Sequence, residues 1–445
     1  MLLLRNKLRL HESPLLLVLG VGLLHLWIVW PGFWTPDTHT QYAMALRGLY
    51  SDHHPPMMSW VWHYLNKLEP GSGLLLGLHL SFLYAAVFYF MKSFAQQKIR
   101  FAFLLLPFIP QIFIYAGFIW KDVGFAFSFL CCAAYLSYIT SMQKPLPWYA
   151  LISIFLILLY GTALKFQAQY CAPILLLWIA HSFARYEINF KRFVPIFCAL
   201  SFVFYGSLKS FNDYWVPEKQ RNYSWQYVKI YDLAAISIHS GVMFLPDCIK
   251  NENFSDKALH DTFYRNGIPV SVDELVFGAK AILRKGNNPV ERTLIYKAWV
   301  RGLMSYPRIY LRHRANNMAY ALLSRPGFMY VPQVLSHLST PETPLYRVLY
   351  ASLGILFYVL MSHMNAAILC LVYLAYSVKM QARSWAAMPL LYLNAIGLSV
   401  LGILFFCSMA GTPRYTYILV CMVHASHVFA YHCYRAKPLK KLGFF

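Results

Sequence analysis

Acidic and histidine side chains gather in one short polar stretch that follows the first apolar segment. The stretch contains Asp37 and, fifteen residues later, the run Asp52, His53 and His54. A carboxylate at a low-dielectric boundary can have a raised pKa and act as a general base, or it can bind a divalent metal. The pattern therefore predicts an interfacial site that holds acids and imidazoles. The structural alternative is that Asp37 caps a helix and the histidines are interfacial polar residues.

Residues 40–50 of this stretch are predicted to form an amphipathic helix on the membrane surface. Apolar residues recur there at helical spacing: Tyr42, Ala45, Leu46 and Leu49. Thr38 or Thr40 can cap the helix, because a hydroxyl oxygen accepts a hydrogen bond from the first turn. The sequence then gives a tight turn, Asp-His-His-Pro-Pro, at residues 52–56.

Basic residues stand at several other junctions between apolar and polar segments. They are Lys121 beside Asp122, Lys165 before Gln167, Arg414 beside Tyr415, and, around Pro307, the group Lys297, Arg301, Arg308, Arg312 and Arg314. Spacings of four, seven and four place the first four of that group near one helical face, provided that Pro307 does not interrupt the helix. Several cations together favour an anionic headgroup, most simply a phosphate. Taken singly, each can instead be a membrane anchor or, at Lys121-Asp122, a structural ion pair.

The composition indicates a membrane protein. Of 445 residues, 59% are hydrophobic and 13% are charged, whereas a soluble domain carries roughly 25% charged residues. An ordinary soluble enzyme and a disordered chain are thereby excluded. The 39 basic residues outnumber the 17 acidic ones, which in a membrane protein indicates cytoplasmic anchoring loops and contact with anionic lipid or phosphate, not with nucleic acid.

The predicted fold is an all-α polytopic membrane protein with about ten transmembrane helices. Nine apolar stretches are candidate spans: 14–34, 73–91, 101–119, 123–141, 148–164, 171–184, 193–208, 385–408 and 415–431. The stretch 346–378 is too long for one simple span and short for two. The distribution of basic loops favours one crossing there, with part of it re-entrant or strongly tilted. The first stretch is expected to be a retained span and not a cleaved signal peptide.

The positive-inside rule places the polar elements of interest on the outer face. They are the loop 35–72, the corner Trp120-Lys121-Asp122, the segment from about 210 to 345, and the turn at 411–415. We therefore divide the chain into a transmembrane module at 1–209, an outer domain at 210–345 and a second transmembrane module at 346–445. The outer domain is predicted to be mostly helical, with helices at 225–237, 257–265, 272–285 and 290–305, and to rest on the membrane.

Cysteine-pair motifs and nucleotide-binding motifs are both absent from the sequence. The nine cysteines include no C-x-x-C pair, which argues against a zinc site and against thiol redox chemistry. No G-x-x-x-x-G-K-[ST] motif and no soluble nucleotide-binding βαβ pattern occurs. An ATP-driven pump and a nucleotide-sugar enzyme of the soluble type are therefore disfavoured, and a donor already attached to lipid fits better.

An acid directly after the first span, an amphipathic helix and then His-Pro-Pro before the second span resemble the GT-C superfamily of membrane glycosyltransferases. The resemblance is to the bacterial branch that contains protein O-mannosyltransferase-like enzymes and the lipid A aminoarabinose transferase. At motif level it is strong over residues 34–60. The Lys121-Asp122 corner, the Lys165 junction, the outer domain and the late Arg414-Tyr415 fit the same plan over most of the chain.

The resemblance implies transfer of a sugar from a polyprenyl phosphate such as undecaprenyl phosphate to a glycan, lipid or protein acceptor of the cell envelope. The site would lie on the periplasmic face of a bacterial cytoplasmic membrane. Asp37 would be the general base or the acid that orients the acceptor, and Asp122 would be the second catalytic acid. The groups that bind substrate would be Asp52, His53, His54, Lys121, Lys165, Arg308, Arg312, Arg414 and Tyr415. A single Asp37 stands where many members carry paired acids, so the requirement for a divalent metal stays open.

Two other functions are consistent with parts of the sequence. An O-antigen polymerase or ligase would use a lipid-linked oligosaccharide, and the arginine-rich outer domain is compatible with it. A flippase for a lipid-linked sugar usually shows two similar halves and spans broken near the midplane. The halves of this chain do not resemble each other, and its polar residues cluster at the outer surface.

Overall fold

The computed structural model describes residues 14–183, 190–264, 271–323, 362–381 and 383–436. Regular structure within these ranges is helical, apart from three isolated β-bridges. The chain divides into two compact units, which we describe separately. The first unit comprises Met1–Gln220, Arg325–Val400 and Tyr417–Phe445, and the second comprises Arg221–Ser324 and Leu401–Thr416.

Long apolar helices dominate the first unit, as the composition predicts. They are α2 (Pro14–Val29), α5 (Gly73–Ser93), α7 (Lys121–Met142), α8 (Trp148–Leu164), α9 (Ala172–Phe183), α10 (Phe190–Trp215), α17 (His363–Met380), α18 (Ala387–Cys407), whose last turns belong to the second unit, and α19 (Tyr417–Arg435). Five helices in the described residues are long and apolar enough to cross a membrane, or six with one bent pair. The chain is thus an all-α, multi-pass membrane protein. The count of ten crossings stays a prediction, because residues 346–361 lie outside the described ranges.

The bent pair has an identifiable cause. The 3-10 helix η2 (Lys98–Phe108) and helix α6 (Pro110–Ala116) meet at an angle of 53°. Pro107 lies inside the first and Pro110 begins the second. Because proline has no N–H and restricts the residue before it, two prolines in four positions interrupt the helical hydrogen bonds and redirect the chain.

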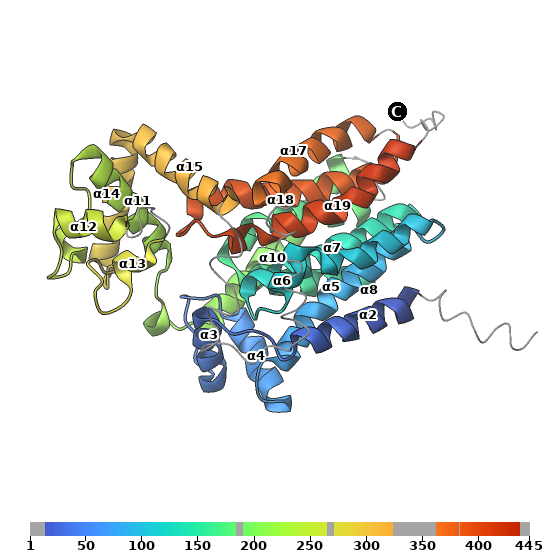
Figure 1. The fold of residues 1–445 in the computed structure, drawn as a ribbon, viewed down its shortest axis with the longest axis horizontal. Helices are drawn as coiled ribbons and strands as arrows, with labels where there is room; N and C mark the ends of the chain where they lie inside the picture. The colour runs from blue at the N-terminus through green and yellow to red at the C-terminus, as the bar shows by residue number, and fades with distance from the viewer. Residues whose placement is uncertain (1–13, 184–189, 265–270, 324–361, 382, 437–445) are drawn as a thin grey trace, which may run out of the picture. The chain divides into compact units, whose positions relative to one another are not determined.

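Helix α7 lies at the centre of the first unit, with α5 and α8 packed along it (Figure 1). Of its most apolar stretch, 89% is buried, against 11% for α10. Small residues permit the close approach: a Cβ at Gly124 would meet the imidazole of His79, and one at Gly161 would overlap the Ser128 hydroxyl. A buried hydrogen bond of 2.8 Å between His79 Nε2 and the Tyr160 hydroxyl joins α5 to α8.

The predicted amphipathic helix is present but begins earlier than expected. Helix α3 spans Pro36–Arg47, and Gly48 ends it in the left-handed conformation. The prediction that Thr38 or Thr40 caps this helix is wrong, since both lie inside it and Thr35 is the N-cap residue. Proline at the first helical position explains the start, because its fixed φ is already helical and its missing N–H is not needed there.

The second unit is helical and has its own apolar core. Its helices are α11 (Trp225–Ser240), α12 (Asp256–Phe263), α13 (Asp273–Val276), α14 (Pro289–Ser305) and α15 (Pro307–Leu323). The helices predicted at 225–237, 257–265 and 290–305 are confirmed within two or three residues. The helix predicted at 272–285 is wrong beyond residue 276. There the chain turns through Gly278, whose φ is +88°, and Leu283 N–H donates back to the Leu275 carbonyl at 2.9 Å.

A substitution at Gly161 tests the packing of α7 against α8. We expect Gly161→Leu to lower the free energy of unfolding by about 1–3 kcal/mol, because the added side chain has no space beside Ser128. Thermal unfolding of the purified protein in detergent measures the change. Gly77→Leu is the matched control, since no atom lies within 4 Å of a Cβ at that position. Equal unfolding midpoints for the two variants would contradict the packing described.

Candidate functional site

The polar segment after α2 binds directly to the segment that precedes α7. Phe33 N–H donates to the Gly117 carbonyl at 2.8 Å, and Ile119 N–H donates to the Phe33 carbonyl at 3.1 Å. Side chains extend the contact: the Trp120 indole N–H donates to Thr35 Oγ1 at 2.9 Å, and the Thr38 hydroxyl donates to the Ile119 carbonyl at 3.1 Å. The first turn of α3, which contains Asp37, is therefore fixed at the end of α7 where Lys121 and Asp122 begin the helix.

Asp122 and Lys165 form a buried ion pair. The Lys165 ammonium contacts Asp122 Oδ1, and the two side chains are 5% and 3% exposed respectively. Lys165 follows the last residue of α8 and has extended backbone, so its side chain reaches the start of α7. Asp122 Oδ2 is buried and accepts no hydrogen bond within the described part of the chain. The pair thus holds a carboxylate and an ammonium together in a place that excludes water.

Lys121 makes the second contact of this cluster. Its ammonium lies 2.7 Å from His54 Nδ1. Because an ammonium can only donate, His54 accepts at Nδ1 and carries its proton at Nε2. His54 is buried, and its ring contacts that of His53 with centroids 4.6 Å apart. The Asp-His-His-Pro-Pro turn therefore binds the beginning of α7, and helix α4 (Met57–Leu68) follows that turn.

Aromatic side chains, of which the sequence reasoning had singled out only Tyr42, support the two loop helices. The ring of Tyr42 on α3 lies 4.9 Å from Trp34 and 4.8 Å from Trp62 on α4. The Tyr42 hydroxyl donates to Asn66 Oδ1 at 2.8 Å, and the Trp34 indole donates to Ser72 Oγ at 2.8 Å. Leu46 is 55% exposed. The inward residues of α3 thus pack on α4, while an apolar residue remains on its outer side.

The remaining predicted residues belong to the second unit and form a separate set. Arg414 and Tyr415 lie in the short 3-10 helix η7 (Pro413–Thr416), where the guanidinium lies 5.3 Å from the phenol ring centroid. Arg308 and Arg312 are exposed on α15. Helix α14 ends at Ser305 and α15 begins at Pro307, so the proposed single face of basic residues is interrupted. Pro307 is the physical reason, because proline cannot continue the helical hydrogen bonds.

A buried polar cluster in the second unit was missed by the sequence reasoning. Asp232 Oδ2 accepts from Arg314 at 2.7 Å and from the Trp299 indole at 2.8 Å, and neither member of the ion pair is exposed. His313 Nε2 lies 3.6 Å from Asp232 Oδ1. Burial raises the pKa of Asp232, while Arg314 and Trp299 oppose that rise. The available signal was a single acid among the apolar residues 230–236.

Arg314 also positions the segment that carries Arg414. Its guanidinium donates to the Ser408 carbonyl at 2.6 Å, and Val272 N–H donates to the Met409 carbonyl at 3.0 Å. Gly411 lies so close to α15 that a Cβ would meet the Asn317 carbonyl oxygen at 2.8 Å. The backbone of residues 408–411 is therefore held against the helices of the second unit, directly before Arg414.

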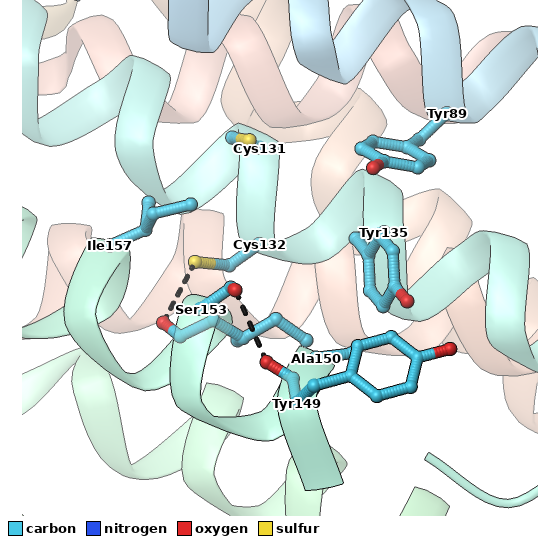
Figure 2. Close-up of a pocket in the computed structure, with 9 residues that line it drawn as sticks. Tyr89, Cys131, Cys132, Tyr135, Tyr149, Ala150, Ser153 and Ile157 are labelled. Atoms are coloured by element: carbon cyan, nitrogen blue, oxygen red, sulfur yellow. Dashed lines mark hydrogen bonds between the residues drawn. The ribbon is translucent and has the colours of Figure 1, made fainter. Parts of the chain in front are cut away.

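A cavity of about 180 Å³ lies among α5, α7 and α8 and is distinct from these clusters. Figure 2 shows Tyr89, Tyr135 and Tyr149 around it together with Cys131 and Cys132. None of the predicted site residues lines it. Cys131 is nine residues beyond Asp122 on α7, which corresponds to about 14 Å along the helix.

No metal site of three or more His, Cys, Asp and Glu side chains is formed by the described residues. No family model, no curated protein and no solved structure matches the chain. The candidate site consists of an ion pair, a histidine-lysine contact and the first turn of α3, all at one end of α7.

Removing the cation of the buried pair tests its importance for folding. Lys165→Met leaves the Asp122 carboxylate buried beside an apolar side chain, so we expect the free energy of unfolding to fall by about 3–5 kcal/mol. The double variant Asp122→Asn/Lys165→Met should recover most of the loss, because no lone buried charge remains. Thermal unfolding in detergent measures both. Lys144→Met, at an exposed lysine between α7 and α8, should match the wild type, and equal stability for Lys165→Met would contradict the pair.

His313 makes the second unit sensitive to acid. Burial, with Arg314 beside it, lowers the pKa of His313 from 6.5 to about 3. Between these values the unfolded chain binds a proton that the folded chain does not, so the stability contributed by neutral His313 is lost as the pH falls from 6.5 towards 3. We expect His313→Phe, which keeps a ring against Tyr231, to lose less stability than the wild type on acidification. Unfolding midpoints compared from neutral to mildly acidic pH measure this, and parallel losses would contradict it.

Proposed function

We propose that this protein is a membrane glycosyltransferase that takes a sugar from a polyprenyl phosphate and passes it to an acceptor of the cell envelope. The observation that carries the proposal is the cluster at the start of α7. Two cations, Lys121 and Lys165, and the carboxylate of Asp122 meet there with His54, and the first turn of α3 brings in Asp37. The groups lie at the end of a largely buried apolar helix, where a lipid phosphate would enter from the bilayer.

The chemistry needs one base and a stabilised leaving group. The acceptor hydroxyl attacks the anomeric carbon, the bond from that carbon to the phosphate oxygen breaks, and the lipid phosphate leaves with the electron pair. A carboxylate accepts the proton of the hydroxyl, and we assign this role to Asp37. Cations aimed at the leaving phosphate stabilise the charge that develops on it, and we assign this role to Lys121 and Lys165.

Asp122 has a more restricted role in this proposal than a second proton acceptor. Its Oδ1 is in contact with Lys165, so it keeps that ammonium in position. Its Oδ2 is the oxygen that can accept a hydrogen bond from a hydroxyl of the sugar or the acceptor. His53, His54 and Asp52 complete the wall of the site on the side of the turn before α4. We propose the outer face of a bacterial cytoplasmic membrane as its location: the distribution of basic loops favours the outer face, and the resemblance to the GT-C superfamily suggests a bacterial cytoplasmic membrane.

A second candidate is a polymerase or ligase that uses a lipid-linked oligosaccharide. The observation that favours it is the set of exposed cations on α15, Arg308 and Arg312. A longer donor would carry additional polar or anionic groups, and the exposed arginines could bind them. A flippase has less support, because the described polar cluster contains an acid suited to proton transfer.

Transfer from defined donors tests the proposal. The purified protein in lipid nanodiscs is given radiolabelled undecaprenyl-phosphate monosaccharides and a membrane extract as acceptor. We expect label to move to a new product with release of the lipid phosphate, and Asp37→Asn to reduce the rate by about 100-fold or more, because general base catalysis contributes that much. Glu69→Gln is the matched control, since Glu69 is an exposed acid that follows α4 of the same loop.

The outcomes separate the alternatives. Transfer only from lipid-linked oligosaccharides would favour the polymerase or ligase. Equal rates for Asp37→Asn and the wild type, at equal expression, would contradict the role of Asp37 as general base even if the transfer itself occurs.

A further inference from the structure

One face of α14 is unlike the rest of the surface of the second unit. The residues at positions 290, 294, 297, 301 and 304 follow one another at spacings of three and four, so they lie along a single helical stripe. All five are exposed: Val290, Leu294, Lys297, Arg301 and Met304. Val290 is 70% exposed and Met304 is 79% exposed. We name this stripe the α14 face; it consists of three apolar and two cationic side chains and contains no acid.

The opposite side of α14 explains why these residues point outward. Ile295 and Gly302 are buried, and Gly302 packs against Leu233 and Ile236 of α11. The only acid of the helix, Glu291, lies beside this buried side and forms a two-point ion pair with Arg284, at 2.9 and 3.1 Å. Core packing and this ion pair therefore fix the orientation of α14 about its own axis. The α14 face is the side of the helix that remains exposed.

The cations of the α14 face are not neutralised by any acid of the described residues. Lys297 and Arg301 form no ion pair within the described ranges, and neither do Arg308 and Arg312, which are exposed on α15 with Leu311. Exposed apolar residues that occur singly are ordinary. Three apolar residues that flank two unpaired cations on one stripe are typical of helices that lie in the headgroup region of a membrane, where apolar side chains enter the acyl boundary and cations meet lipid phosphates.

A second helix of the same unit provides the contrast. The exposed residues of α12 are Asp256, Lys257, His260 and Asp261, which are polar and of both signs. This is the composition expected of a surface that faces water. The difference between α12 and α14 is therefore a property of particular faces and not of the unit as a whole.

We propose that the α14 face binds the surface of a membrane that contains anionic phospholipid. Chain connectivity favours a lipid surface over a soluble acidic partner. The second unit begins at Arg221, six residues after the candidate span α10 ends at Trp215, and it includes the last turns of the candidate span α18. It is thus held within a few residues of the bilayer at two points. The proposal does not depend on sugar transfer, because it concerns a surface that contains none of the groups assigned to the reaction at α7.

Photo-crosslinking of the full-length protein in nanodiscs tests the proposal. The photoreactive residue p-benzoylphenylalanine is placed at Met304 or, as the matched control, at Lys257 on α12. The nanodiscs contain phosphatidylcholine alone or mixed with phosphatidylglycerol, and mass spectrometry identifies the adducts. We expect phospholipid adducts at position 304 and not at 257, several-fold more with phosphatidylglycerol. The increase should vanish in Lys297→Gln/Arg301→Gln, because the cations attract the anionic headgroup.

Each other result overturns the proposal. Equal lipid adducts at 304 and 257 would show that the α14 face has no preference for the membrane. Adducts at 304 to a second copy, or to another segment of the same chain, would show that protein covers the face. An unchanged increase with phosphatidylglycerol in the double variant, whose unfolding midpoint should equal that of the wild type, would show that the two cations do not bind the headgroups.

Discussion

The arrangement of the first unit's polar residues depends on the buried ion pair between Asp122 and Lys165. Removing water from a carboxylate and an ammonium costs several kcal/mol for each, and only their mutual contact offsets that cost. The contact therefore fixes the start of α7 against the end of α8. Lys121 precedes Asp122 directly, and its contact with His54 fixes the turn before α4 in the same place.

The apolar helices supply a rigid base for these contacts. Inside a bilayer the hydrophobic effect does not drive helices together, so close packing of small residues and buried hydrogen bonds must specify their arrangement. Gly124 and Gly161 provide the close approach, and the hydrogen bond between His79 and Tyr160 joins the flanking helices. Helices α3 and α4 then pack on one another through aromatic rings. The polar residues of the loop are thus held in place by the packing of the apolar helices and by the packing of α3 on α4.

The sequence predicts those elements of the fold that depend on a local pattern of residues. Apolar stretches located the long helices, and periodicity located α11, α12 and α14. It failed at 272–285, because the apolar spacing continues through Gly278 while the chain reverses there. The N-cap of α3 was misplaced because Thr38 donates instead to the Ile119 carbonyl, 81 positions away. The partners of Asp122 and Asp232 lie 43 and 82 positions distant, and no local pattern pairs residues over such separations.

Two buried acid–cation pairs occur in the described residues, and their surroundings differ. Asp232 lies against Arg314, the Trp299 indole and His313, all within the core of the second unit. The ion pair between Asp232 and Arg314 holds the backbone at Ser408. That backbone segment leads to Arg414, and it is the pair's one connection to a predicted site residue among the described residues. Asp122 lies at a helix end, beside Lys121 and the turn that contains His54. A pair that serves packing alone can be replaced by apolar residues of similar volume without loss of function. A pair that also contacts substrate cannot be replaced in this way. The position of Asp122 makes its pair with Lys165 the candidate for contact with substrate.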